Sequence, residues 1–110
     1  MKHSITHISD NAEYYFRLAM EGQGREAPEQ VIVNFDRAIA SNPGYALAWN
    51  EKGNFLDGEG RLSDALACYD ISLKIDPGNA EVWFNKGLTL RKMGRENEAF
   101  SCINKGIDLA

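Results

Sequence analysis

Residues 49–56 read WNEKGNFL, and residues 83–90 read WFNKGLTL. The tryptophan, the Lys-Gly pair and the final leucine recur 34 residues apart. The same shift aligns Cys68 with Cys102 without a gap. Self-similarity at a fixed period of this length is the signature of repeat proteins. The chain is therefore predicted to be an array of short structural units that pack against one another.

A weaker copy of the pattern precedes the two strong ones. It has Tyr15, Ala19 and Pro43 where the middle copy has Trp49, Gly53 and Pro77. We therefore predict an N-terminal tail and one domain, 12–110, made of three repeats. The tail and the repeats span 1–11, 12–45, 46–79 and 80–110.

Each copy has the pattern of two helices. In the middle copy, Trp49, Gly53 and Leu56 are spaced by four and three residues, which places them on one helix face. A Gly-rich turn follows, and Pro77 ends the second helix because proline cannot continue the hydrogen-bond ladder. The prediction is an all-α fold with six antiparallel helices. They are expected near 11–22, 28–41, 45–57, 62–75, 79–92 and 96–109.

A glycine recurs inside the first helix of two copies, at Gly53 and Gly87. A glycine in a helix interior costs about 1 kcal/mol relative to alanine. Its recurrence in one register indicates a geometric need, namely the close approach of two helix backbones. We expect Gly53 to face the region of Ala65, and Gly87 to face the region of Ala99.

Taken together, these positions resemble the tetratricopeptide repeat family. The middle copy carries the resemblance in Trp49, Gly53, Leu56, Ala65, Tyr69 and Pro77. The third copy carries it in Trp83, Gly87, Leu90 and Ala99, with Ile103 at the aromatic position. The first copy departs most, with Gly22 and Val31. The resemblance implies a right-handed α-α superhelix, or solenoid. Its concave face, lined by the first helices, would bind a peptide or a protein segment.

Composition limits the partners that we expect. The chain has 44% hydrophobic and 25% charged residues, which is typical of a folded, soluble protein. It has no apolar run long enough to span a membrane and no signal-peptide block, so we expect no membrane partner and a cytoplasmic location. The net charge of −4 argues against a nucleic-acid partner.

The sequence offers little for catalysis. His3 and His7 have a spacing that suits metal chelation on a helix, but no third ligand stands nearby. Because both histidines are in the tail, no Ser-His-acid triad is predicted. Cys68 and Cys102 are interpreted as packing residues. We therefore expect a protein that is not an enzyme, with no catalytic residue, no metal and no cofactor.

The partner-binding groove is predicted from the helix face opposite the packing residues. Its predicted lining is Phe16, Met20, Leu47, Asn50, Asn54, Phe84, Leu88 and Arg91. Asn50 and Asn54 would hydrogen-bond a partner's backbone, and Arg91 would favour an acidic group. The alternative is that Ile5 and Ile8 of the tail cover this apolar stripe.

Some members of the family clamp the C-terminal carboxylate of a chaperone with lysine, arginine and asparagine on this face. The corresponding positions here are Phe16, Met20, Glu51, Glu81 and Asn85. Four of these five residues do not fit that clamp, and two have the wrong charge. A carboxylate clamp is therefore not expected.

The last helix suggests an alternative function, self-assembly as a structural solenoid segment. Phe100 and Ile107 stand at the positions of Leu66 and Leu73, which the following repeat would cover. We predict that Phe100 and Ile107 meet a second copy in a two-fold homodimer through the C-terminal helix, or that the chain is a segment of a longer array.

Overall fold

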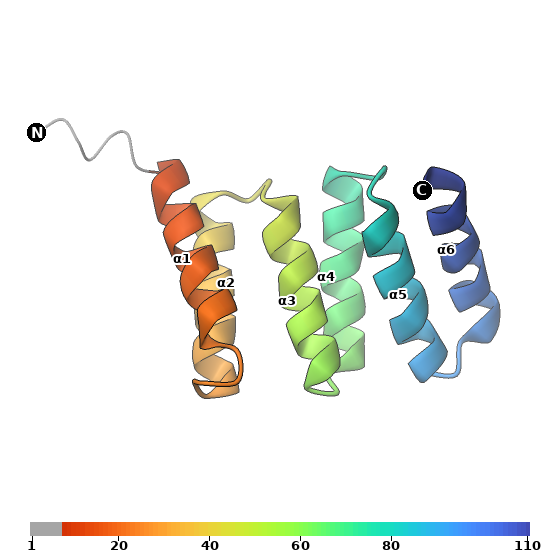
Figure 1. Cartoon of the computed structure of the whole chain (residues 1–110), viewed down its shortest axis with the longest axis horizontal. Helices are drawn as coiled ribbons and strands as arrows, with labels where there is room; N and C mark the ends of the chain where they lie inside the picture. The colour runs from red at the N-terminus through yellow and green to blue at the C-terminus, as the bar shows by residue number, and fades with distance from the viewer. Residues whose placement is uncertain (1–7) are drawn as a thin grey trace, which may run out of the picture. The chain divides into compact units, whose positions relative to one another are not determined.

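The computed structural model describes residues 8–110, which form six α-helices and contain no strand. This confirms the all-α prediction. The helices, labelled in Figure 1, are α1 (Ile8–Gly22), α2 (Pro28–Ser41), α3 (Ala46–Gly58), α4 (Leu62–Ile75), α5 (Ala80–Lys92) and α6 (Glu96–Leu109). Every bound lies within three residues of its predicted position.

Local chemistry sets the helix ends. Pro28 occupies the first turn of α2, where its missing N–H removes no intrahelical bond. At the start of α5, the side chain of Asn79 accepts a hydrogen bond of 3.0 Å from the backbone N–H of Glu81. The turn within each repeat contains a glycine with φ near +80°, a conformation that residues with a Cβ rarely adopt.

The chain divides into two compact units at the boundary between Ala48 and Trp49, and each is described by itself. In the N-terminal unit, α1 packs against α2 around Ala19, Val31 and Phe35, which are fully buried. The ring of Phe16 lies 6.2 Å from that of Phe35, centroid to centroid. The single domain over 12–110 stays a prediction.

In the C-terminal unit, α5 packs against both α4 and α6, as the ribbon shows (Figure 1). Its core contains Tyr69, Val82 and Leu90, each at most 1% exposed. The half-buried Trp83 donates a hydrogen bond of 2.9 Å from its indole Nε1 to the carbonyl oxygen of Pro77. This bond ties α5 to the turn that precedes it.

The glycines permit close approach, but one faces a different residue from the one predicted. A Cβ added at Gly53 would lie 2.7 Å from Cε1 of Tyr69, so this glycine faces an aromatic ring and not Ala65. A Cβ at Gly87 would lie 2.7 Å from Cγ1 of Ile103 and 3.1 Å from the carbonyl oxygen of Ala99. The prediction for Gly53 was wrong because the glycine makes room for the large side chain one helical turn beyond the alanine.

Candidate partner-binding site

The C-terminal unit contains a hollow of about 220 Å³ on the side formed by α3 and α5. Residues from both helices line it, and α4 contributes one side chain at its floor. The lining residues are Asn54, Asp57, Tyr69, Asn85, Leu88, Arg91 and Lys92. Three of the predicted groove residues, Asn54, Leu88 and Arg91, therefore lie together.

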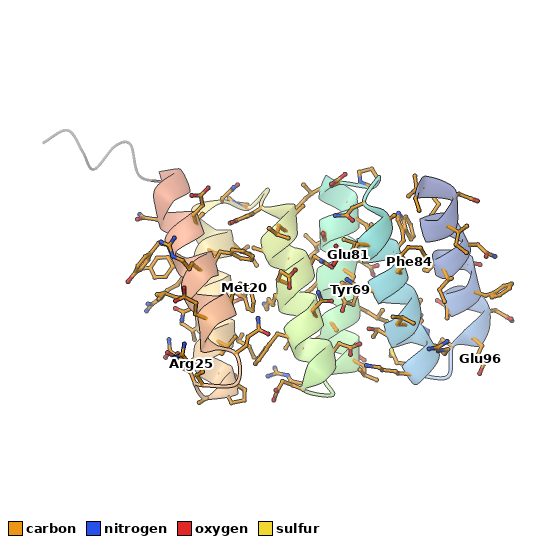
Figure 2. All side chains as sticks on the ribbon, in the orientation of Figure 1. Met20, Arg25, Tyr69, Glu81, Phe84 and Glu96 are labelled. Carbon is orange, nitrogen blue, oxygen red and sulfur yellow. The ribbon has the colours of Figure 1, made fainter. Side chains whose placement is uncertain are left out.

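Tyr69 forms the floor of this hollow. Its ring fills the space left by Gly53, and its hydroxyl donates a hydrogen bond of 2.7 Å to Oδ1 of Asn54. Burial raises the pKa of the Tyr69 phenol well above its ordinary value of 10.0. The phenol therefore stays protonated and remains a hydrogen-bond donor throughout the physiological range. Figure 2 labels Tyr69 on α4.

Asp57 holds α3 and α5 together at one end of the hollow. Its carboxylate accepts hydrogen bonds from Oγ1 of Thr89 and from Nζ of Lys92. The Asp57 side chain is only 15% exposed, so the ammonium group of Lys92 compensates its charge locally. Asp57 and Lys92 therefore act as a structural pair.

Arg91 and Leu88 are left to face outward. Arg91 is exposed and has no ion-pair partner among residues 11–110, and Leu88 is 43% exposed. A free guanidinium beside an exposed apolar side chain can bind a carboxylate and an apolar group at the same time. Arg91 and Leu88 are therefore the groups of the hollow that are available to bind a partner.

The structure corrects the expectation for Asn50. Asn50 is 2% exposed, and its Oδ1 accepts a hydrogen bond of 3.2 Å from Nδ2 of Asn85. It fastens α3 to α5 and does not face a partner. Asn54 lines the hollow, but its carboxamide oxygen is already bonded to Tyr69. The predicted pair of asparagines binding a partner's backbone is therefore wrong for Asn50.

Phe84 is half-buried and lies between α5 and α6 (Figure 2). A Cβ added at Gly106 of α6 would lie 2.8 Å from the Phe84 ring, so the ring rests directly on that backbone. This packing leaves only part of the ring accessible.

The remaining predicted groove residues belong to the N-terminal unit. Phe16 is half-buried, with its ring centroid 5.3 Å from that of Tyr45. Met20 is 38% exposed and Leu47 is 49% exposed. Ile5 and the side chain of Ile8 lie outside the described residues, as do His3 and His7.

Sequence reasoning missed the part that Tyr69 plays. From the sequence, Tyr69 is only one of the positions that carry the family resemblance, whereas its hydroxyl reaches the hollow. The usable signal was chemical: the equivalent positions hold Phe35 and Ile103, so only the middle repeat places a hydroxyl there.

A second surface lies on the outer side of α6. Phe100 is 68% exposed and Ile107 is 58% exposed, whereas the equivalent Leu66 and Leu73 of α4 are 8% and 7% exposed. A hollow of about 240 Å³ adjoins this face. It is lined by Arg91, Glu96, Ala99, Phe100 and Ile103.

Two further observations bear on function. Among the described residues, no helix combines the length and the apolar character that a membrane crossing requires. Within that same part of the chain, no three histidine, cysteine or acidic side chains gather where they would bind a metal ion.

Sequence profiles of the tetratricopeptide repeat match residues 34–80 and 68–100, and the two matches together cover more than half of the chain. The chain belongs to the tetratricopeptide repeat family. Its fold class is accordingly an all-α solenoid of helix-turn-helix repeats. Proteins of this family are typically non-catalytic scaffolds.

The chain is similar to several known proteins. It is 34% identical over 58 residues to the uncharacterized protein MJ0572 of Methanocaldococcus jannaschii, a match covering 53% of this chain and 67% of that protein. The crystal structure of MamA is 27% identical with a TM-score of 0.86, over 90% of this chain and 58% of that one. YrrB, described as a TPR protein with an unusual peptide-binding site, is 26% identical with a TM-score of 0.81, over 90% of this chain and 51% of that one. The chain thus spans little more than half the length of these two structures.

Proposed function

We propose that the protein is a non-catalytic interaction module, and that the hollow between α3 and α5 binds a peptide or helical segment of a partner protein. The observation that carries this proposal is the guanidinium of Arg91, which has no ion-pair partner among residues 11–110, beside the exposed Leu88. The groups beneath them are already bonded to one another, so they shape the hollow and leave recognition to its rim.

Arg91 and Leu88 form the rim of the hollow, and they determine which kind of partner segment fits there. An acidic side chain would form a charge-assisted pair with Arg91, and an apolar side chain near it would cover Leu88. An amphipathic segment with an acidic residue next to an apolar one satisfies both requirements. In the N-terminal unit, the exposed Met20 and Leu47 offer apolar contacts of the same kind.

A clamp for a terminal carboxylate fits this surface poorly. Such a clamp requires several cations free to converge on one group, and Lys92 is engaged with Asp57. Arg91 then remains as the available cation of the hollow. One cation with an apolar neighbour suits an internal acidic side chain better.

The reactivity of the lining argues for binding over catalysis. A general base or nucleophile requires a pKa near the working pH. Burial raises the pKa of the Tyr69 phenol, away from that range, and the Asp57 carboxylate is engaged by Thr89 and Lys92. The site therefore holds fixed donors and acceptors without an activated group.

The test is an NMR titration of the isotope-labelled protein with two matched sets of short synthetic peptides. One set pairs leucine with glutamate, and the other replaces glutamate by lysine. We expect the signals of Asn54, Asn85 and Arg91 to shift with the acidic set alone. Leu88→Glu should weaken binding by about tenfold or more, as a buried anchor does. Lys74→Glu, an exposed change on α4 away from the hollow, is the control.

Equal shifts with both peptide sets would contradict recognition through Arg91. No shift with either set, in a protein that folds normally, would contradict the binding site itself.

A second candidate function is self-association through the outer face of α6, as a structural segment. The exposure of Phe100 and Ile107, in the positions where Leu66 and Leu73 are buried, favours it. In sedimentation experiments, the protein should then exceed the monomer mass as its concentration rises, and Phe100→Glu should return it to the monomer.

A further inference from the structure

We propose that the outer face of α6 binds α1 of a second copy of the chain, head to tail, in the way that α5 covers α4 within one chain. This inference rests on the self-association proposed above, and it names the second surface. It differs from a two-fold dimer because the two contacting surfaces are different.

The first argument is the contrast between α4 and α6. α6 packs against α5, the first helix of its own repeat, and yet Phe100 and Ile107 remain exposed. The equivalent Leu66 and Leu73 of α4 are buried, and α4 is the helix that α5 packs against from the following repeat. The first helix of a following repeat therefore covers these two positions on α4. A helix that packed against α6 as α5 packs against α4 would cover Phe100 and Ile107.

The second argument is that α1 has an uncovered face in the matching register. α1 corresponds to α5 two repeats earlier, so Tyr14 corresponds to Val82. Val82 is fully buried, whereas Tyr14 is 49% exposed. α1 packs against α2 as α5 packs against α6, but α5 is also packed against the preceding α4. The face of α1 that carries Tyr14 is thus the one that a preceding repeat would cover.

The third argument is charge. At the contact of α3 with α5, Asp57 accepts a hydrogen bond from Thr89. One repeat later, Arg91 stands at the position of Asp57, and in α1 the position of Thr89 is held by Glu21. Both side chains are exposed, and neither has an ion-pair partner among residues 11–110. The register that joins Asp57 to Thr89 would therefore join Arg91 to Glu21 of the second copy.

Such a contact is heterologous, so every copy offers one surface of each kind and the assembly does not close at a dimer. A two-fold dimer through α6 would instead bury Phe100 against Phe100 and leave Tyr14 and Glu21 uncovered. The two arrangements therefore respond differently to changes in α1.

The first experiment exchanges the charges and follows the assembly by sedimentation velocity. Glu21→Arg and Arg91→Glu each place like charges in contact, and each should weaken association by about tenfold or more. An equimolar mixture of the two variants, or both changes in one chain, should restore it because every contact is matched again. Lys74→Glu makes the same change of charge as Arg91→Glu, but on α4, and should leave association unchanged. Failure of the mixture to recover would overturn the pairing.

The second experiment blocks one surface at a time. Phe100→Glu blocks α6 and Tyr14→Glu blocks α1, and both positions are exposed enough for folding to be retained, which circular dichroism checks. Each variant should be monomeric, and their mixture should stop at a one-to-one dimer.

If Tyr14→Glu still dimerises by itself, the head-to-tail contact is wrong and the two-fold contact is right. If the unaltered protein is monomeric at every concentration, self-association itself is wrong. Both variants keep Leu88 and Arg91, so the peptide titration can be carried out on either monomer, and a failure of association leaves the test of peptide binding intact.

Discussion

The middle and last helix pairs of the C-terminal unit share a glycine register but fill it differently. Between α3 and α4, Gly53 makes room for the ring of Tyr69 from the second helix. Between α5 and α6, Gly87 faces the aliphatic Ile103, and the aromatic ring comes instead from Phe84 on the first helix, against Gly106. The repeat pattern thus determines where two helix backbones approach. The residues of each repeat determine which of the two helices contributes the large aromatic side chain.

The same two pairs differ on their outer sides. α4 presents Leu66 and Leu73 to a packed neighbour, whereas α6 presents Phe100 and Ile107 to solvent. Because hydrophobic stabilisation scales with the apolar area removed from water, side chains at equivalent positions contribute unequally to the free energy of unfolding. Two substitutions test how far this difference extends.

The largest effect is expected for Leu66→Ala. Truncating a buried leucine typically costs about 2–5 kcal/mol, because the transfer energy is lost and a cavity remains. Phe100→Ala removes a larger side chain but one that is 68% exposed, so its cost should stay within about 0.5 kcal/mol. Urea unfolding measures both, at a concentration low enough to keep the chains apart. Equal losses would show that the two faces are buried alike in solution.

The outcome at Phe100 also depends on the protein concentration. If α6 is covered by a second copy, the cost of Phe100→Ala should grow as the concentration rises, because association stabilises the folded state by mass action. The cost of Leu66→Ala should not change with concentration.

The sequence was sufficient to predict the helices. Local signals are given by Pro28 and Pro77 and by the turn glycines Gly60 and Gly94, and together with the 34-residue period they place every helix bound within three residues. The beginning of α1 at Ile8 is the largest departure, three residues before the predicted start. These signals act within one repeat, which is why reading one repeat at a time finds them.

The candidate site could be predicted only in part. Leu88 and Arg91 follow from helix periodicity, and both line the hollow. The roles of Asn50 and Tyr69 do not, because each depends on a partner from another helix: Asn85 for the first and Asn54 for the second. Periodicity gives the direction of a side chain, but it does not give the identity of the group that the side chain meets.

A smaller effect is expected when leucine replaces either helical glycine. Overpacking of a close contact typically costs about 1–3 kcal/mol. Gly87→Leu should cost more than Gly53→Leu, because the carbonyl oxygen of Ala99 at 3.1 Å is part of the backbone and cannot rotate away. Thermal unfolding measures both variants. Gly58→Ala is the control, since no described atom outside the chain neighbours and the backbone of the same helix lies within 4 Å of the added Cβ.

The reverse order, with Gly53→Leu the more harmful, would show that the buried Tyr69 ring is held more rigidly than the backbone of α6. An unchanged stability in both variants would mean that neither pair of helices approaches closely.

An effect smaller than that of either glycine substitution is expected at neutral pH for Tyr69→Phe. Phenylalanine should fit because Phe35 fills the equivalent position in the N-terminal unit, where it is fully buried. The change removes the hydrogen bond to Asn54, which should lower the free energy of unfolding by about 0.5–1.5 kcal/mol. Urea unfolding at neutral pH measures this difference. A larger loss would mean that the phenol supports more of the hollow than Asn54 alone.

The sign of that difference should reverse in alkali. The pKa of Tyr69 is raised by burial in the folded protein, whereas in the unfolded chain it stays near 10.0. Below pH 10 both states hold the proton, so the stability of the native protein is complete. Above pH 10 the unfolded chain loses the proton first, so stability falls as pH rises, by at most about 1.4 kcal/mol per pH unit from this group.

Tyr69→Phe has no phenol at this position, so it does not show this loss of stability. Tyr45, whose pKa burial also raises, contributes equally to both proteins. The variant should therefore be the less stable protein at pH 7 and approach or exceed the native protein above pH 11. Parallel decline of the two proteins above pH 10 would show that the Tyr69 phenol ionises in the folded state as freely as in water.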